Sequence, residues 1–261
     1  TSVYYANRVV PMLPKELSNG ICSLNPNEDR LTFSATMEIS NSGELKSYKF
    51  DKSVIRSRVK GVYSEVNQIL DGSATDEIKQ KYHEVYDNIF IMDELADILI
   101  ANKKNRGCPE IETSESKLII DDNDICVDVK PRTRGKSEMI IEEFMLLANQ
   151  SSANLARKMN IPFVYRVHEV PPIEKVDRLK ECLLKLNVEY PQFSEIKPSH
   201  MAEILKSAKG TDKFELINNI VLRSMAKAKY DKTPIGHFGL ALKDYAHFTS
   251  PIRRYPDLAI H

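Results

Sequence analysis

The stretch HFGLALKDYAHFTSPIRRYPDLAIH, residues 237–261, decides how the rest of this chain is interpreted. It combines histidines, tyrosines, a Thr-Ser-Pro turn and two adjacent arginines within one short segment. Arg253 and Arg254 precede Tyr255, so we expect their guanidinium groups to leave the backbone on different sides and at least one to point inward. An inward guanidinium requires an anion, because an unpaired buried charge is very costly.

The sequence offers two anions for such a guanidinium. Asp257 is close enough in the chain to form an internal ion pair with it. The other candidate is a phosphate group, because the planar guanidinium fork bonds two phosphate oxygens at once, which a lysine ammonium cannot do. Spacing alone leaves both interpretations open.

Three segments of the chain carry a family resemblance. HFTSPIRRYPDL at 247–258, with a following histidine, resembles the signature of the ribonuclease II/ribonuclease R family of 3′-to-5′ exoribonucleases. RVVPMLPKELSNGICSLNP at 8–26 and SVIRSRVKGVYSEVNQIL at 53–70 resemble further blocks of the same family. The resemblance therefore extends along nearly the whole chain.

The bulk composition is that of an ordinary globular protein. The 261 residues are 42% hydrophobic and 28% charged, with 37 Lys+Arg and 37 Asp+Glu. Net charge therefore gives no indication of a nucleic-acid partner, and any basic surface must be local. The cysteines are widely spaced without a C-x-x-C pair, which argues against a zinc site or disulfide framework and suits the cytoplasm. No apolar run approaches the length of a membrane span, so we expect no membrane partner.

The pattern of apolar residues predicts an α+β fold, with antiparallel hairpins or a mixed sheet packed with several helices. Alternation predicts a strand over 30–39, paired with 44–50, and a second hairpin joins 117–121 to 125–129. The proline-rich residues 9–14 predict an extended, buried connector, and residues 18–20 a turn. Helical periodicity predicts the segments 73–102, 137–158, 199–209 and 211–229, and residues 161–187 read as a strand, a proline turn and a helix.

The resemblance implies a catalytic domain with a deep, narrow channel that single-stranded RNA enters 3′ end first. Residues 1–261 then read as part of a ribonuclease II-type catalytic domain. The chain opens without an initiator Met and stops inside the signature, so we expect a piece of a longer polypeptide. We expect it to lack the N-terminal metal-binding segment and the flanking RNA-binding domains, which have oligonucleotide-binding folds in the family.

The resemblance also implies which residues contact RNA. Tyr4 matches a tyrosine that stacks on a base near the cleavage point, and Glu142 matches a glutamate that contacts the ribose. The aromatic partner of that tyrosine falls at Ile111 here, which weakens the two-sided stack. Family members commonly have a histidine a few residues before the Glu-Glu pair. This chain has Glu138 there instead, and no role is predicted for that position.

In the signature, Arg253 matches the residue that neutralises charge on the scissile phosphate, and it is the predicted catalytic residue. Arg254, Tyr255 and Asp257 match positions that support this arginine loop, and we count Arg254 and Tyr255 among the RNA-binding residues. Removing such an electrostatic donor costs about 10²–10³-fold in turnover.

A local basic run precedes the helix at 137–158. Its members are Lys130, Arg132, Arg134 and Lys136. Cations ahead of a helix N-terminus favour a track for the phosphate backbone, with Arg134 as an RNA-binding residue, although a solvated loop explains them equally well. Arg166 and His168 match family positions near RNA, and structural roles explain them at least as well.

No metal ligand is predicted within this chain. Asp121, Asp122, Asp124 and Asp128 lie at the tip of the second hairpin, where Asp and Asn favour the turn itself, and their spacing forms no oxygen cage. The resemblance implies a Mg²⁺-dependent, two-metal hydrolysis whose aspartate ligands lie upstream of Thr1. We therefore expect these 261 residues alone not to hydrolyse RNA.

The resemblance implies a processive 3′-to-5′ exoribonuclease that releases 5′-nucleoside monophosphates from single-stranded RNA. The alternative is a non-catalytic RNA-binding or regulatory relative with the same fold. The residues upstream of Thr1 separate the two, because closely spaced aspartates there favour the enzyme.

Overall fold

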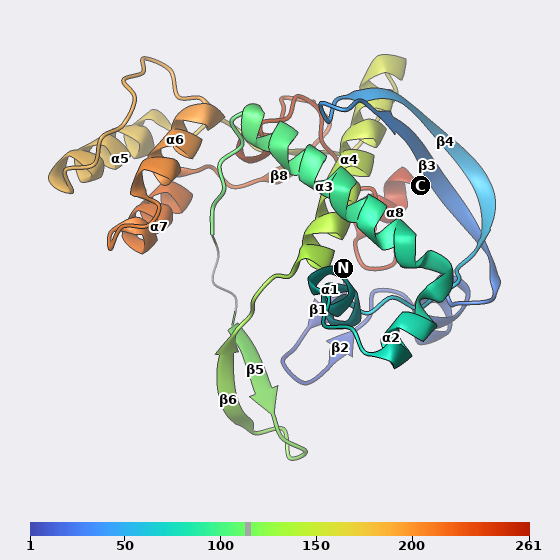
Figure 1. Ribbon diagram of the computed structural model, residues 1–261. Coiled ribbons are helices and arrows are strands. Elements are labelled where there is room, and N and C mark those ends of the chain that lie inside the picture. Colours follow the sequence, from blue (N-terminus) through green and yellow to red (C-terminus); the bar gives the residue numbers. More distant parts are fainter. Residues whose placement is uncertain (113–115) are drawn as a thin grey trace. The chain divides into compact units, whose positions relative to one another are not determined.

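A computed structural model describes residues 1–112 and 116–261, which form two compact units (Figure 1). Unit 1 comprises Thr1–Ile100, Ser114–Ala148 and Phe248–His261, and unit 2 comprises Ala101–Thr113 and Asn149–His247. Within the described residues, no helix combines the length and apolar character that crossing a membrane requires.

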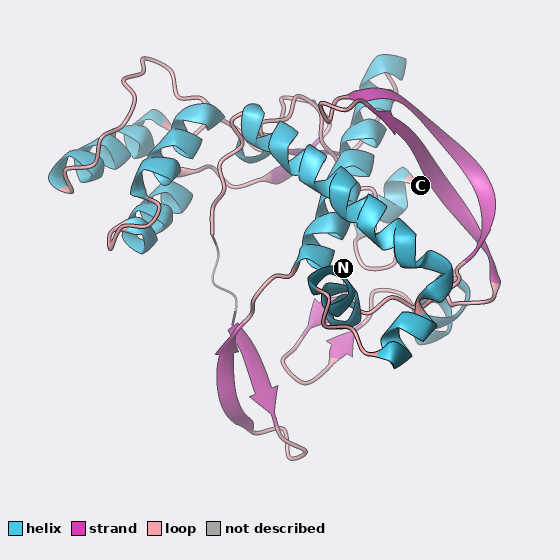
Figure 2. Cartoon of the chain, in the orientation of Figure 1, coloured by secondary structure: helices cyan, strands magenta, loops and turns pink. Residues whose placement is uncertain are grey.

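Short paired strands alternate with helices along the chain, which confirms the predicted α+β class (Figure 2). Unit 1 contains β1 (Val3–Tyr4), β2 (Val9–Val10), the π-helical η1 (Glu16–Ile21), β3 (Asp29–Ile39), β4 (Leu45–Arg56), α1 (Tyr63–Asp71), α2 (Asp76–Lys81), η2 (His83–Val85), β5 (Ser116–Ile120), β6 (Cys126–Pro131) and α8 (Tyr255–Ile260). Unit 2 contains β7 (Tyr165–Val167), α5 (Ile173–Lys185), α6 (Pro198–Ala208), α7 (Phe214–Ser224), β8 (Lys229–Asp231) and η3 (Phe238–Leu240). Two helices, α3 (Tyr86–Asn105) and α4 (Lys136–Met159), begin in unit 1 and end in unit 2.

All strands of the described residues pair as two-stranded antiparallel ribbons, β1 with β2, β3 with β4, β5 with β6 and β7 with β8. The mixed sheet that the sequence left open is therefore not formed among them. Each strand has a single neighbour, so the ribbons depend on side-chain packing rather than on a wide sheet for their stability.

The β3–β4 ribbon confirms the predicted alternation, but its apolar face is not buried along its whole length. Leu31 is 88% exposed and faces Val54 across the ribbon, whereas Thr32 and Ser34 on the other face are half-buried. Their hydroxyl groups bond Ser53 Oγ at 2.8 and 2.6 Å. A two-stranded ribbon twists strongly, so one face does not remain against the core from end to end.

The single helix predicted over 73–102 is wrong, because the segment breaks at Tyr82. α2 begins after Thr75, whose Oγ1 accepts a hydrogen bond from Ile78 N–H at 3.4 Å, and α3 begins only at Tyr86. Tyr82 is 2% exposed, and its hydroxyl donates to Glu65 Oε2 at 2.7 Å and accepts from Val62 N–H at 2.9 Å. These tertiary bonds fix the ring at the break, and no periodicity in the sequence reveals them.

The N-terminal segment also differs from the prediction. Val9 and Val10 form strand β2 and are 49% and 47% exposed, so they are not part of a buried connector. Residues 18–20 lie inside η1 rather than in an isolated turn. The buried connector is wrong because β2 pairs with β1 alone, which leaves the ribbon open to solvent.

The core of unit 2 lies among α5, α6 and α7, which carry Leu179, Leu183, Met201, Ile204, Ile217 and Val221 with at most 1% exposure. The strand, proline turn and helix predicted within 161–187 are confirmed as β7 and α5. Ile111 packs against this same cluster, which gives it a structural role.

Two histidine rings meet beside this core in edge contact, His168 and His237, with centroids 5.1 Å apart. His168 Nε2 donates to the Ala226 carbonyl at 2.9 Å, and its Nδ1 accepts from Gly239 N–H at 2.9 Å. Burial, reinforced by the charges of His168 and Arg166, lowers the pKa of His237 to about 3. Burial likewise lowers the pKa of His168. The pair is therefore neutral in the folded protein at neutral pH.

This pair predicts a loss of stability in mild acid. Both histidines have a lower pKa in the folded than in the unfolded chain, so below about pH 6.5 the unfolded chain binds more protons. The unfolding free energy therefore decreases as the pH is lowered. Each contributes a slope of up to about 1.4 kcal/mol per pH unit. His237→Phe keeps an aromatic ring at this position and removes one titrating group. The unfolding free energy, measured by urea denaturation between about pH 6.5 and pH 5, should therefore depend less steeply on pH than in the wild type. An unchanged slope would contradict this assignment.

Candidate functional site

A buried carboxylate closes the loop that carries the paired arginines. Asp257, in α8, is fully buried, and its Oδ1 accepts from Arg254 Nη2 at 2.6 Å and from Ser250 N–H at 2.8 Å. Asp257 Oδ2 and Arg254 Nε are buried without a hydrogen-bond partner. The loop between Ser250 and Asp257 is therefore fixed by one side chain that neutralises Arg254.

The other arginine of the pair has a different environment. Arg253 is exposed, and its Nη2 donates to Ser250 Oγ at 3.1 Å. Among the described residues Arg253 forms no ion pair, whereas Arg254 forms an ion pair with Asp257. The two guanidinium groups thus diverge as the sequence predicted, and the inward one is Arg254. Arg253 carries an uncompensated positive charge held in place by a hydroxyl group.

The chain's first residues hold the backbone of this loop. The Arg253 carbonyl accepts from Ser2 N–H at 2.9 Å and from Thr1 Oγ1 at 2.7 Å. Ser2 Oγ in turn accepts from Met12 N–H at 2.9 Å, which closes the open end of the β1–β2 ribbon. Tyr4, two residues beyond Ser2, is 62% exposed. Hydrogen bonds therefore connect the ribbon of Tyr4 directly to the arginine loop, although the two are at opposite ends of the sequence.

An aromatic cluster fixes both ends of the terminal segment within unit 1. The rings of Phe248 and His261 stack with centroids 4.5 Å apart, and His261 Nε2 donates to the Phe248 carbonyl at 2.9 Å. Phe50 and Phe33 present ring edges to Phe248, with centroids 5.3 and 5.8 Å away. The arginine loop lies between two residues that are packed against β3 and β4, so the ribbon acts as its scaffold.

The predicted residues Glu142 and Arg134 form a second cluster at the start of α4. Arg134 Nη1 donates to Glu142 Oε2 at 3.3 Å, and both side chains are exposed. Glu143 is 7% exposed, so of the adjacent glutamates Glu142 is the accessible one. Arg134 therefore folds over the first turns of α4 and brings positive charge beside Glu142.

Glu138, for which the sequence predicted no role, organises the start of α4. Its Oε2 accepts from Gly135 N–H at 3.1 Å and from Asn67 Nδ2 at 3.2 Å. Burial opposes ionisation, but the bonds from Asn67, Ser137 and Gly135 hold the pKa of Glu138 below its usual value. A glutamate three residues after Gly135 matches the spacing of a helix-capping carboxylate, which is a signal that the sequence contained.

Three other predicted positions have plain structural settings. Tyr255 is 66% exposed at the first position of α8. The guanidinium carbon of Arg166 lies 4.9 Å from the centre of the Tyr230 ring, and His168 is bonded within unit 2. These bonds favour the structural interpretation of Arg166 and His168.

The hairpin tip confirms the turn interpretation of its aspartates. Asp121 Oδ1 accepts from Asn123 N–H and from Ile125 N–H, both at 2.9 Å. Over residues 1–112 and 116–261, no three His, Cys, Asp or Glu side chains gather as a metal site requires.

Comparisons with known proteins agree along the whole chain. The model of the RNB domain matches residues 1–261. The chain is 42% identical to ribonuclease R of Thermotoga maritima and 40% identical to ribonuclease R 1 of Lactococcus lactis; all of this chain aligns, against 36% and 32% of those proteins. It thus spans about a third of the length of the curated relatives it matches. A structure of Mycoplasma genitalium RNase R with ribose-methylated single-stranded RNA has a TM-score of 0.93 at 32% identity, covering 100% of this chain and 40% of that one.

The Asp257 carboxylate predicts a large stability loss on neutralisation. Asp257→Asn keeps the shape but leaves the half-buried Arg254 without its counter-ion, which should cost about 3 kcal/mol of unfolding free energy. Urea denaturation followed by circular dichroism measures it. Asp29→Asn is the matched control, because Asp29 pairs with Arg56 in solvent and its loss should have little effect. Equal losses in the two variants would contradict the role of the buried carboxylate.

Proposed function

Because the chain belongs to the RNB-domain family, we propose that it forms part of the catalytic domain of a processive 3′-to-5′ exoribonuclease. Its substrate is single-stranded RNA, which is hydrolysed to 5′-nucleoside monophosphates. The observation that carries the proposal is Arg253, whose charge is exposed and uncompensated beside a neutralised neighbour. A loop in which one guanidinium is paired with a carboxylate and the other is not is suited to receive a phosphodiester.

Arg253 acts electrostatically in this proposal. Its guanidinium bonds the non-bridging oxygens of the scissile phosphate and stabilises the charge that develops there. Ser250 Oγ orients the side chain, and the bonds from Ser2 and Thr1 to the Arg253 carbonyl hold its backbone. A donor held before the substrate arrives reorganises little during the reaction, which makes its contribution large.

The base and sugar contacts come from the neighbouring elements of unit 1. Tyr4 presents an exposed ring on β1, two residues from the bond to Arg253, and stacks on a base. Glu142 accepts from a ribose hydroxyl, and Arg134 and Tyr255 contact the strand. Arg254 contributes through Asp257, by holding the loop rather than by a direct contact.

The described residues do not fit the Mg²⁺ centre that the resemblance implies, because they provide no grouped carboxylates. We infer that the ligands of the metal come from outside the described residues. We also propose that the full protein has flanking domains with oligonucleotide-binding folds, as the resemblance implies, because the relatives are about three times as long as this chain. The four cysteines, all within the described residues, form no disulfide, which is consistent with a cytoplasmic setting.

Arg253→Gln should lower the turnover of bound single-stranded RNA by about 10²–10³-fold while RNA affinity changes little, because the contact strengthens as charge develops. Single-turnover hydrolysis of a labelled oligoribonucleotide by the intact protein measures the rate. Arg56→Gln, an exposed arginine on β4, is the matched control and should leave the rate unchanged. A large loss of affinity with normal turnover would identify Arg253 as a docking residue. RNA binding without any wild-type turnover would identify a non-catalytic relative.

Tyr4→Ala should weaken single-stranded RNA binding by about 1–3 kcal/mol for every base composition, because the lost contact is a stack. The matched control is Tyr5→Ala, since Tyr5 is similarly exposed at 56% and lies beneath Arg8, 5.6 Å from its ring centre. Fluorescence anisotropy with homopolymeric oligoribonucleotides compares the two. Equal effects from both tyrosines would refute a specific stack at Tyr4.

A further inference from the structure

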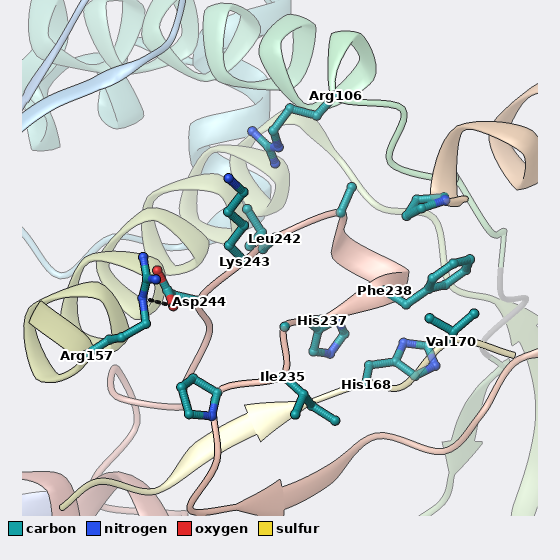
Figure 3. Close-up of a pocket in the computed structure, with 14 residues that line it drawn as sticks. Arg106, Arg157, His168, Val170, Ile235, His237, Phe238, Leu242, Lys243 and Asp244 are labelled. Atoms are coloured by element: carbon teal, nitrogen blue, oxygen red, sulfur yellow. Dashed lines mark ion pairs between the residues drawn. The ribbon is translucent and has the colours of Figure 1, made fainter. Parts of the chain in front are cut away.

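Unit 2 contains a pocket of about 550 Å³ that the proposed reaction does not use (Figure 3). Its lining comes from the ends of α3 and α4, the start of α6, His168 and Val170, and residues 234–238 and 241–244. This volume is within the range of pockets that hold small molecules. Every lining residue lies within unit 2, so the pocket is formed by one compact unit.

One side of the pocket is positively charged. Arg106, Lys243 and Arg157 lie along this side, with Asp244 beside Arg157 (Figure 3). Arg157 Nε lies 2.7 Å from Asp244 Oδ1, and Asn154 Nδ2 donates to Asp244 Oδ2 at 2.9 Å. Both oxygens of the single carboxylate are thus engaged, and the pocket retains a surplus of positive charge.

Lys243 and Arg106 are the other two cations of the lining. Lys243 is exposed and forms no ion pair within the part of the chain that the structure describes. Arg106 Nη1 donates to Asn102 Oδ1 at 2.6 Å, which orients the planar guanidinium at the end of α3. In Figure 3 the Lys243 ammonium points toward the Arg106 guanidinium on the same side of the pocket. A planar donor fork beside an ammonium group suits phosphate oxygens.

The opposite side of the pocket is apolar and aromatic. His237, Phe238 and His168 lie there with Val170 and Ile235 (Figure 3). Val170 and Ile235 are each 52% exposed, so they offer apolar surface to a ligand. The bonds of His168 to Ala226 and Gly239 fix its ring as a neutral imidazole. This side can accept a flat heterocycle without a competing charge.

We propose that this pocket binds a nucleoside 5′-monophosphate, with the phosphate at Lys243 and Arg106 and the base against the apolar side. The division into a cationic side and an apolar side, on which Val170 and Ile235 are exposed, matches the two ends of such a ligand. All of its lining residues belong to unit 2, and none of them belongs to the arginine loop. Ligand binding here is measured without turnover, so the proposal stands or falls independently of the exoribonuclease activity.

Isothermal titration of the protein with AMP in metal-free buffer tests the proposal. AMP should bind saturably, and adenosine, which lacks the phosphate, should bind at least about tenfold more weakly. Lys243→Gln and Arg106→Gln should each weaken AMP binding by about tenfold. Lys232→Gln, an exposed lysine of unit 2 outside the pocket, is the matched control and should bind AMP as the wild type does.

Several outcomes would overturn the site. They are the absence of saturable binding at millimolar AMP, equal affinity for adenosine and AMP, or an effect of Lys232→Gln as large as that of Lys243→Gln. Circular dichroism of the Lys243→Gln variant distinguishes lost binding from lost folding, and because Lys243 is exposed the spectrum should be unchanged.

A competition experiment separates free mononucleotide from a nucleotide within a strand. A short oligoadenylate that loses affinity in Lys243→Gln and is displaced by AMP would identify a strand nucleotide as the occupant. An oligoadenylate that is unaffected, while AMP binding is lost, would identify the free monophosphate. If neither ligand responds to the substitution, the assignment is wrong.

Discussion

The fully buried carboxylate of Asp257 is the constraint on which the proposed site depends. A buried carboxylate is costly unless opposite charge and hydrogen bonds stabilise it, and Arg254 and the Ser250 amide supply both at Oδ1. Their engagement fixes the loop's shape and consumes one of the two adjacent guanidinium groups. The remaining one, Arg253, is left facing solvent with its charge available.

The loop is held from outside as well as from within. The bonds from Ser2 and Thr1 to the Arg253 carbonyl tie the two ends of the sequence together, and the stack of Phe248 on His261 closes the segment against β3 and β4. A guanidinium carried on a loop with several independent anchors keeps its position when a substrate arrives, which is the requirement for electrostatic stabilisation of a transition state.

Helices and hairpins were predictable wherever local pattern decides them. The period of β3, the turn at Asp121 and the succession of β7 and α5 all follow from residues close in sequence. The segment 73–102 failed because the break at Tyr82 depends on bonds to Glu65 and Val62, which lie in another part of the chain. The buried connector at 9–14 failed because β2 has only β1 as a neighbour. Glu138 carried a recognisable capping spacing, but its bond from Asn67 was not visible in the sequence.

The amino-acid sequence was enough to identify the family from its motifs and the α+β class from local periodicity, and the family resemblance then implied the candidate residues Tyr4, Glu142 and Arg253. It left open which arginine of the pair turns inward, since adjacent side chains diverge whichever one is buried. Only the tertiary structure decided that Arg254 takes Asp257 and that the carbonyl of Arg253 meets Ser2. These contacts depend on burial and on chain segments far apart in sequence, and local pattern contains no information about either.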